Sequence, residues 1–216
     1  MPEIFDYIIA GGTIYDGTGT DGRSGDVGLK GDRIAAVGDL GKAHAREKTD
    51  ASGLAVTPGF IDAHTHSDLP ALLAPLAENR LYAGVTTEIG GNCGFSAGPL
   101  GEGQDKQFLE HYEGLDVSWR TQGEYFSLLE KAGSAVNHAF LVGFGNVRRT
   151  ATGGDVNRVP TAAEMKHMKS LVAAEIEAGA IGMSSGLIYP PGCYATKEEI
   201  AEVASAMKGK GLTYAS

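Results

Sequence analysis

Two histidines separated by a single residue, His64 and His66, are the strongest candidates for chemistry in this sequence. They follow an apolar stretch and a Pro58-Gly59 entry, and we expect Val56–His66 to form one β-strand. Side chains alternate between the two faces of a strand, so Asp62, His64 and His66 would point the same way. Two imidazoles at that spacing can reach one cation at bonding distances of about 2.0–2.1 Å. An isolated His-x-His can also be two polar loop residues, but its place after a strand, where the C-terminal rim of a barrel would lie, favours a metal site.

Cys93 is the third candidate ligand. It lies just beyond the next expected strand, in the glycine-rich stretch Gly90-Gly91-Asn92-Cys93-Gly94, and so at the edge where the histidines are expected. A cysteine thiolate is a good zinc ligand, whereas a free cysteine more often packs as a small buried residue. The residues alone leave both interpretations of Cys93 open.

The remaining cysteine and histidines carry weaker signals. Cys193 lies in a loop and nothing pairs with it by spacing, so we interpret it as structural. The other histidines are expected to be solvated or packed side chains: His44, His111, His138 and His167. The glycine pairs at 11–12 and 90–91 form neither a dinucleotide-binding nor a P-loop pattern, which argues against a phosphate cofactor.

The elements that must position these residues fall into two parts. Residues 1–55 hold short apolar runs bounded by Asp-Gly and Gly-Gly pairs, which predict hairpins of a small sheet with few residues to fill a core. Beyond them, strands alternate with helices, and three helices begin with a threonine and a glutamate three residues later, as in a capping box. This alternation predicts an α/β fold with parallel strands, either a barrel or an open doubly wound sheet. The expected strands are Val56–His66, Gly84–Gly90, Ala139–Gly145, Ala180–Ser185 and Leu212–Ala215, and the expected capping pairs are Thr121 with Glu124, Thr161 with Glu164 and Thr196 with Glu199.

Composition excludes several partners. The 216 residues include 18 basic and 27 acidic side chains, a formal charge of −9, and no basic run suggests binding to nucleic acid. No apolar run is long enough for a membrane span, and the N-terminus lacks the pattern of a signal peptide, so we expect a cytoplasmic protein. The two cysteines lie far apart, which makes a disulfide framework improbable.

Four motifs resemble a known family. The stretch from Pro58 to His66 is similar to the metal signature of the amidohydrolase superfamily. The stretch from Gly84 to Ser96, with its Asn92-Cys93-Gly94 turn, and the stretch from Gly182 to Gly192 are more specific. Together with the opening Ile9-Ala10-Gly11-Gly12, they resemble the N-acyl-D-amino-acid deacylases, or D-aminoacylases. The resemblance covers essentially the whole chain.

The resemblance implies a fold and a site. The fold would be a TIM-like (β/α)8 barrel with a small β-sandwich assembled from both chain ends, so that residues 1–55 are a partial β-sandwich and residues 56–216 the first half of the barrel. Zinc would be bound by His64, His66 and Cys93. Tyr189 matches a tyrosine that the family uses near the substrate carboxylate, although it can also be an aromatic residue at the rim.

The sequence departs from the family pattern at its end. The family places two further histidine ligands after the fifth and sixth barrel strands, and a metal-binding aspartate, the catalytic acid and base, after the eighth. This sequence ends at Ser216, where the fifth strand would begin to deliver its histidine. We therefore interpret it as truncated, with the catalytic aspartate beyond residue 216.

The resulting functional hypothesis is a zinc-dependent hydrolase of non-peptide C–N bonds that deacylates N-acyl-D-amino acids to a carboxylate and a D-amino acid. A cyclic amidase of the hydantoinase or dihydroorotase type is the alternative within enzymes, and a lysine in place of Cys93 would have favoured it. The alternative from another class is a non-catalytic fragment that functions only with a separately encoded C-terminal half.

Overall fold

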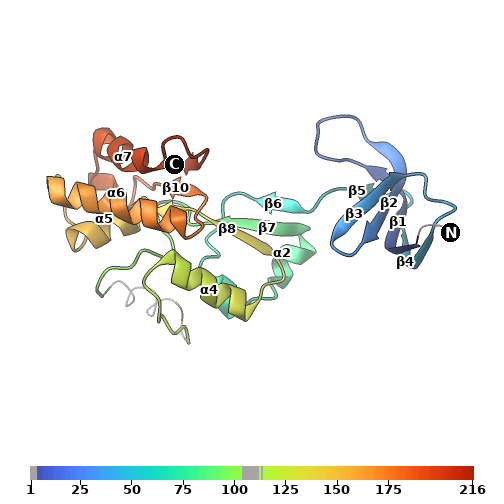
Figure 1. The fold of residues 1–216 in the computed structure, drawn as a ribbon, viewed down its shortest axis with the longest axis horizontal. Helices are drawn as coiled ribbons and strands as arrows, with labels where there is room; N and C mark the ends of the chain where they lie inside the picture. Colours follow the sequence, from blue (N-terminus) through green and yellow to red (C-terminus); the bar gives the residue numbers. More distant parts are fainter. Residues whose placement is uncertain (1–3, 104–111, 113) are drawn as a thin grey trace. The chain divides into compact units, whose positions relative to one another are not determined.

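A computed structural model describes residues 4–103, 112 and 114–216. The chain divides into two compact units between Gly59 and Phe60 (Figure 1). This division lies beyond residue 55 because the strand Ala55–Val56 still pairs with the sheet of the first unit. His111 falls outside the described residues.

The first unit is one five-stranded sheet in the order β3-β2-β1-β4, with β5 also pairing with β1. Its strands pair antiparallel from β1 to β3, whereas β4 and β5 run parallel to β1. The strands are β1 (Ile4–Ile14), β2 (Arg23–Lys30), β3 (Arg33–Gly38), β4 (His44–Asp50) and β5 (Ala55–Val56). The predicted hairpins are thus present.

The core of this unit is small. Its buried apolar side chains are Phe5, Ile8, Ile14, Val27 and Ala51. Gly28 lies directly against Phe5, where a Cβ atom would come within 2.7 Å of the aromatic ring. A larger residue at position 28 would therefore displace the largest side chain of this core.

In the second unit, the described residues form two three-stranded sheets in which every strand pairs in parallel. One has the order β6-β7-β8 and the other β9-β10-β11. The strands are β6 (Phe60–Asp62), β7 (Val85–Gly90), β8 (Asn137–Phe140), β9 (Val142–Gly143), β10 (Gly182–Ser184) and β11 (Thr213–Ala215). The parallel α/β prediction is confirmed at this level.

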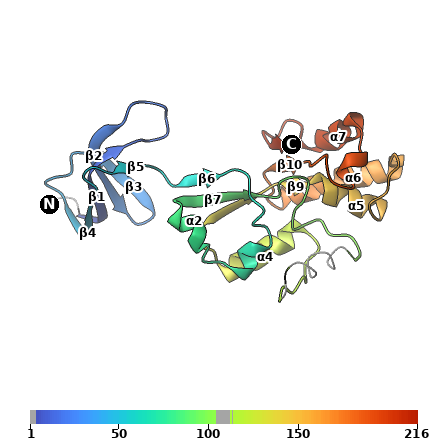
Figure 2. The ribbon, with the colours of Figure 1, turned by 180° about the vertical axis from the view of Figure 1, so that it is seen from behind.

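Two predicted strands were wrong in detail. The expected strand Val56–His66 is interrupted at Pro58-Gly59, where proline removes a ladder donor, and its two parts join different sheets. His64 and His66 consequently lie in the loop after β6, not on a strand. The expected strand Ala139–Gly145 is broken at Leu141, with β8 paired to β7 and β9 paired to β10. In Figure 2, β9 lies beside β10.

Helices connect these strands. They are α1 (Pro70–Leu73), α2 (Glu78–Tyr82), α4 (Gln122–Ala132), α5 (Phe144–Thr152), α6 (Ala162–Glu177) and α7 (Lys197–Ala204), with 3-10 turns η1 (Gly192–Tyr194) and η2 (Ser205–Met207). The capping boxes at Thr121 and Thr161 are confirmed. At Thr196 only half of the box forms, because the carboxylate of Glu199 binds Arg148 instead. In the described part of the chain, no helix is both long and apolar enough to cross a bilayer.

Among the residues that the structure describes, two apolar clusters hold the second unit together. One joins α5, α6 and α7 to β9 and β10, with Phe144, Met168 and Met183 fully buried. The other joins α1 and α4 to β8 around Tyr125 and Phe140. The helices thus cover the strands, and the loops that follow the strands are left to carry polar side chains.

Candidate metal centre

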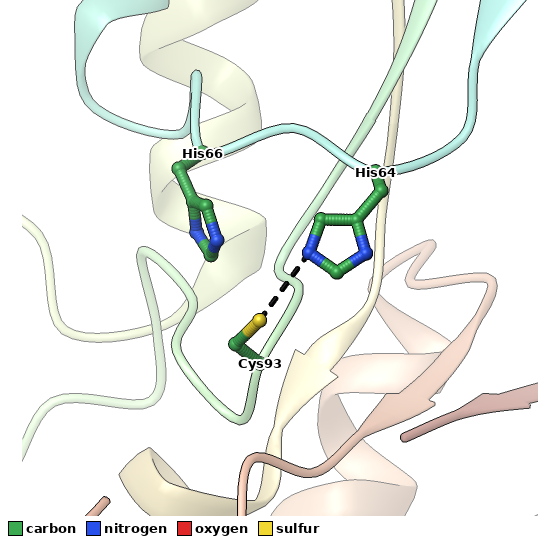
Figure 3. A group of neighbouring side chains, drawn as sticks. All are labelled: His64, His66 and Cys93. Atoms are coloured by element: carbon green, nitrogen blue, oxygen red, sulfur yellow. Dashed lines mark hydrogen bonds between the residues drawn. The ribbon is translucent and has the colours of Figure 1, made fainter.

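His64, His66 and Cys93 lie together, although they come from two different loops (Figure 3). One nitrogen of each imidazole and the Cys93 sulfur all lie within 4.8 Å of one another. The Cys93 Sγ is 3.3 Å from the His64 Nε2. Both histidines are exposed and Cys93 is half-buried, so this group of donor atoms is open to solvent on one side.

Thr65 fixes the loop that carries the two histidines. This residue is buried, and both its backbone N–H and its hydroxyl donate to the carbonyl of Ile89 near the end of β7. The amide of His64 donates in addition to Asp62 Oδ1 at 3.2 Å. The middle residue of the His-x-His motif therefore anchors the loop, and the two imidazoles on either side remain available for binding.

The Cys93 turn follows the end of β7. Cys93 has a φ of +54°, in the left-handed region that side-chain-bearing residues seldom adopt. The side chain of Asn92 donates to the carbonyl of Ile89 at 2.8 Å. The carbonyl of Ile89 thus accepts hydrogen bonds from both loops. This shared contact explains how Cys93 meets His64 and His66, which precede it by 29 and 27 residues.

The donor set fits zinc. Bond lengths of about 2.0–2.1 Å to nitrogen and about 2.3 Å to sulfur place tetrahedral donors about 3.5 Å apart. The 3.3 Å between sulfur and nitrogen, and the 4.8 Å limit for the group, are compatible with that geometry after small side-chain adjustments. Two imidazoles and a thiolate are also the ligand types that zinc prefers. Three donors leave at least one position of a tetrahedral zinc site to be filled by another ligand or by water.

Two cavities border His66. The smaller, of about 160 Å³, lies beside the turn that carries Cys93. Its lining residues are His66, Asp68, Leu69, Phe95, Ser96 and Tyr112. The larger cavity has a volume of about 740 Å³ and extends from His66 along α1 and α2 to Glu88 and His138.

Asp68 is a buried acid next to this group that the sequence did not single out. Burial raises the pKa of its carboxyl to about 7, and hydrogen bonds from backbone amides, including that of Gly91, oppose the shift. Its Oδ1 is buried and has no hydrogen-bond partner among the described residues. The sequence could not reveal this burial, because it depends on packing between α1, α4 and the end of β7.

His138 belongs to a separate polar cluster. Its Nδ1 lies 3.9 Å from Glu88 Oε2, and Glu88 also binds Arg80 at 2.7 Å and accepts from Ser67 at 2.9 Å. Burial lowers the pKa of His138, and the negative charge of Glu88 partly offsets this by raising it. The interpretation of His138 as a packed side chain agrees with this environment.

Among the described residues, the other sequence candidates contribute no atom to this donor group. His167 is exposed on α6, Cys193 is exposed in η1, and His44 lies in the first unit. Tyr189 is 47% exposed, and its ring meets the edge of Phe95 with 5.6 Å between centroids. Phe95 follows Cys93 by two residues, so the Tyr189 side chain is adjacent to the Cys93 turn.

Comparisons with known proteins identify relatives of this chain. The D-aminoacylase of Alcaligenes xylosoxydans xylosoxydans is 41% identical over 213 residues, which cover 98% of this chain and 44% of that protein. The N-acyl-D-glutamate deacylase of the same organism is 38% identical, over 100% of this chain and 44% of the relative. The crystal structure of the N-acyl-D-glutamate deacylase from Bordetella bronchiseptica, complexed with zinc and a phosphonate mimic of the tetrahedral intermediate, superposes with a TM-score of 0.89 at 37% identity. That match covers 98% of this chain and 44% of the solved chain.

The chain therefore spans less than half the length of the curated relatives it matches. Within that span, the model of the amidohydrolase family matches residues 47–215, which include the whole second unit except its last residue. The donor group, the parallel α/β arrangement and this match lead to one assignment: the chain belongs to the amidohydrolase family.

Proposed function

We propose that the protein carrying this chain is a zinc-dependent deacylase, which hydrolyses N-acyl-D-amino acids to a carboxylate and a D-amino acid. The observation that carries the proposal is the convergence of His64, His66 and Cys93. A chain in which these donors meet is 41% identical to a D-aminoacylase over nearly its full length. Cys93, where a cyclic amidase would be expected to have a lysine, favours the deacylase over a hydantoinase-like enzyme.

The roles of the residues follow from their chemistry. His64 and His66 would bind zinc as neutral imidazoles, and Cys93 would bind it as a thiolate whose negative charge partly offsets that of the cation. When bound, zinc would lower the pKa of a coordinated water toward about 7 and polarise the amide carbonyl. The hydroxyl of Tyr189 would donate to the carboxylate of the substrate and orient the amide toward the donor group.

The fold would be the first half of a (β/α)8 barrel beside a partial β-sandwich. The parallel pairing from β6 to β11, with β8 and β9 as two parts of one broken strand, supports this proposal. The acid/base aspartate, the remaining ligands and the rest of the barrel would come from polypeptide outside these 216 residues, either the same chain or a separately encoded half.

A matched set of substrates tests the activity. The protein, expressed together with whatever polypeptide completes it, should release amino acid from N-acyl-D-amino acids only when zinc is present. The L-enantiomers control for stereochemistry, and hydantoin and dihydroorotate control for cyclic amidase activity. Hydrolysis of the ring amides without hydrolysis of the acyl-D-amino acids would overturn the proposal.

A Cys93→Ala variant tests the metal site. Loss of a directly bound thiolate should reduce zinc affinity by more than the ~10- to 100-fold seen when a residue that merely orients a ligand is lost. Turnover should fall with it. The exposed Cys193→Ala is the matched control and should leave both unchanged. Full zinc stoichiometry and activity in Cys93→Ala would remove Cys93 from the site.

A further inference from the structure

The backbone of Cys93 requires support from its surroundings. A left-handed conformation is strained in a residue with a side chain and persists only where neighbouring structure imposes it. Cys93 lies between Gly91 and Gly94, which also have positive φ values of +75° and +77°. Three of the four residues from Gly91 to Gly94 therefore have positive φ values. The hydrogen bonds within the turn do not suffice to hold this conformation.

Ser184, at the end of β10, makes contact with both sides of this turn. Its side chain is completely buried. The backbone N–H of Gly94 donates to Ser184 Oγ at 2.9 Å, and the Ser184 hydroxyl donates in turn to the carbonyl of Gly91. One hydroxyl therefore satisfies the backbone groups that flank Cys93, from a strand some 90 residues away in the sequence.

Gly186 brings the same segment against Cys93 itself. A Cβ atom at position 186 would lie 2.1 Å from the carbonyl oxygen of Cys93 and 2.7 Å from its carbonyl carbon. Both are backbone atoms, which cannot move aside as a flexible side chain could. The backbone after β10 thus packs directly on the backbone of the ligand turn, and a glycine is required there.

We propose that the end of β10 is the positioning element for the Cys93 thiolate, acting through the Ser184 hydroxyl and the close backbone approach at Gly186. The two contacts hold the turn in the left-handed conformation that places Cys93 Sγ 3.3 Å from His64 Nε2. Neither residue contacts the metal or substrate in this role. The inference rests on the proposed function only in that Cys93 is taken as a zinc ligand.

The expected consequence is a weaker and less ordered metal centre when either contact is lost. Ser184→Ala removes the acceptor for Gly94 N–H and the donor to Gly91. Residues that orient a metal ligand typically contribute about 10- to 100-fold in affinity, and a reduction of that size is expected for zinc measured by chelator competition. Cobalt substituted for zinc should show a weaker sulfur-to-cobalt charge-transfer absorption per bound ion, because the thiolate is less well placed.

Ser185→Ala is the matched control. Ser185 is the next residue and is also buried, but its hydroxyl contacts Tyr214 and Ser216, not the Cys93 turn. This variant should keep the zinc affinity and the cobalt spectrum of the parent protein. Melting temperatures of the metal-free proteins identify any general loss of stability in either serine variant.

The outcomes separate this inference from the proposed function. If Ser184→Ala retains parental zinc affinity and cobalt absorption while Cys93→Ala loses both, the positioning role is wrong and the metal site stands. If Cys93→Ala also retains both, the proposed metal site itself is wrong. Should Ser184→Ala fail to fold, Ser184→Cys decides, since it nearly keeps the size of the side chain and weakens both hydrogen bonds: an unchanged cobalt spectrum overturns the proposal and a weakened one supports it.

Discussion

Loops, not strands, present the side chains of this site, and each loop is fixed by a residue that does no chemistry itself. Thr65 fixes the loop of the two histidines through a hydrogen bond to the backbone of β7. Ser184 holds the turn around Cys93 through hydrogen bonds to backbone groups just beyond the end of the same strand. A functional side chain on a loop is placed as accurately as its anchors allow. The residues that anchor the two loops are therefore expected to influence the geometry of the site, although they are not ligands.

Sequence patterns could identify the candidate metal ligands but not the residues that hold their loops in place. His64, His66 and Cys93 were grouped from their chemistry and their places after strands, and the structure brings their donor atoms within 4.8 Å of one another. Their roles as ligands remain a prediction. Ser184 and Asp68 were missed because their importance comes from contacts distant in sequence and from burial, which leave no local pattern.

Tyr189→Phe tests substrate recognition at the residue scale. If the hydroxyl donates to the substrate carboxylate, its loss removes a hydrogen bond to a charged group, and kcat/KM for N-acyl-D-amino acids should fall by about 10- to 150-fold, mainly through KM. A neutral acyl amide without the carboxylate should be much less affected. Equal losses on both substrates would instead indicate that Tyr189 supports Phe95 and the Cys93 turn.

Elements of the second unit are joined by buried charged groups. Arg148 on α5 is fully buried, donates to Glu199 on α7 at 2.8 Å, and also donates to the carbonyls of Val156 and Arg158. One side chain thus joins α5, α7 and the loop before α6. The same contact explains the incomplete capping box at Thr196, since Glu199 cannot bind both Arg148 and the helix start.

Arg148→Met should be strongly destabilising. It leaves the buried Glu199 carboxylate and two backbone carbonyls without their partner, and breaking a buried ion pair in this way costs about 3–5 kcal/mol in the free energy of unfolding. Lys169→Met is the matched control, because Lys169 and Glu202 join α6 to α7 through an exposed pair worth at most about 1 kcal/mol. Denaturant titration compares the two, and similar small losses would contradict the assigned role of Arg148.

Glu175 gives α6 and α4 a pH-dependent contact. Its Oε2 accepts from the amide of Gln122 at the start of α4, at 2.8 Å. Burial raises the pKa of Glu175 to about 7, the hydrogen bond from Gln122 opposes this, and the charge of Glu124 adds to it. Because the folded-state pKa lies above the unfolded value, the stabilising contribution is fully present below about pH 4.5 and is lost as pH rises through about 7.

Glu175→Gln should remove that pH dependence. From pH 5 to pH 8 the parent protein should lose stability relative to the variant, by at most about 3 kcal/mol, with no further change at higher pH. Melting temperatures of the two proteins across this range measure the difference. Glu177→Gln, an exposed carboxyl in the same helix, is the control. A constant difference between Glu175→Gln and the parent would show that Glu175 is ionised in the folded protein throughout.

At the scale of the whole molecule, alternation and helix caps were sufficient to predict the α/β class and the parallel strands. The change of partner at Pro58-Gly59, where β5 pairs with β1 and β6 pairs with β7, was not predictable. The apolar residues on both sides of Pro58-Gly59 have the pattern of one continuous strand. The break at Leu141 was hidden for a similar reason: the run is continuous, and only the tertiary pairing shows that β8 and β9 serve different neighbours. Period-2 patterns identify strands but carry no information about partners.

Open sheet edges lead to the last prediction, which concerns the 216-residue chain by itself. Among the described strands, β6 and β11 each pair on one edge only. Phe60 and Ile61 on β6 are 56% and 64% exposed, and Tyr214 on β11 is 43% exposed. Unpaired strands with exposed apolar side chains favour pairing with another chain. We expect this polypeptide to self-associate and to have no measurable deacylase activity, because the acid/base aspartate is proposed to come from polypeptide outside these 216 residues.

Size-exclusion chromatography with light scattering tests this directly. The expected mass exceeds the 22.4 kDa monomer and rises with concentration. Ile61→Lys should reduce association, because a charge on an edge strand opposes strand addition, whereas Leu54→Lys, an exposed leucine of the first unit, should not. Adding the polypeptide that we propose completes the barrel should abolish the association altogether. A single 22.4 kDa species that binds zinc tightly and turns over an N-acyl-D-amino acid would show that these edges are stable as they are.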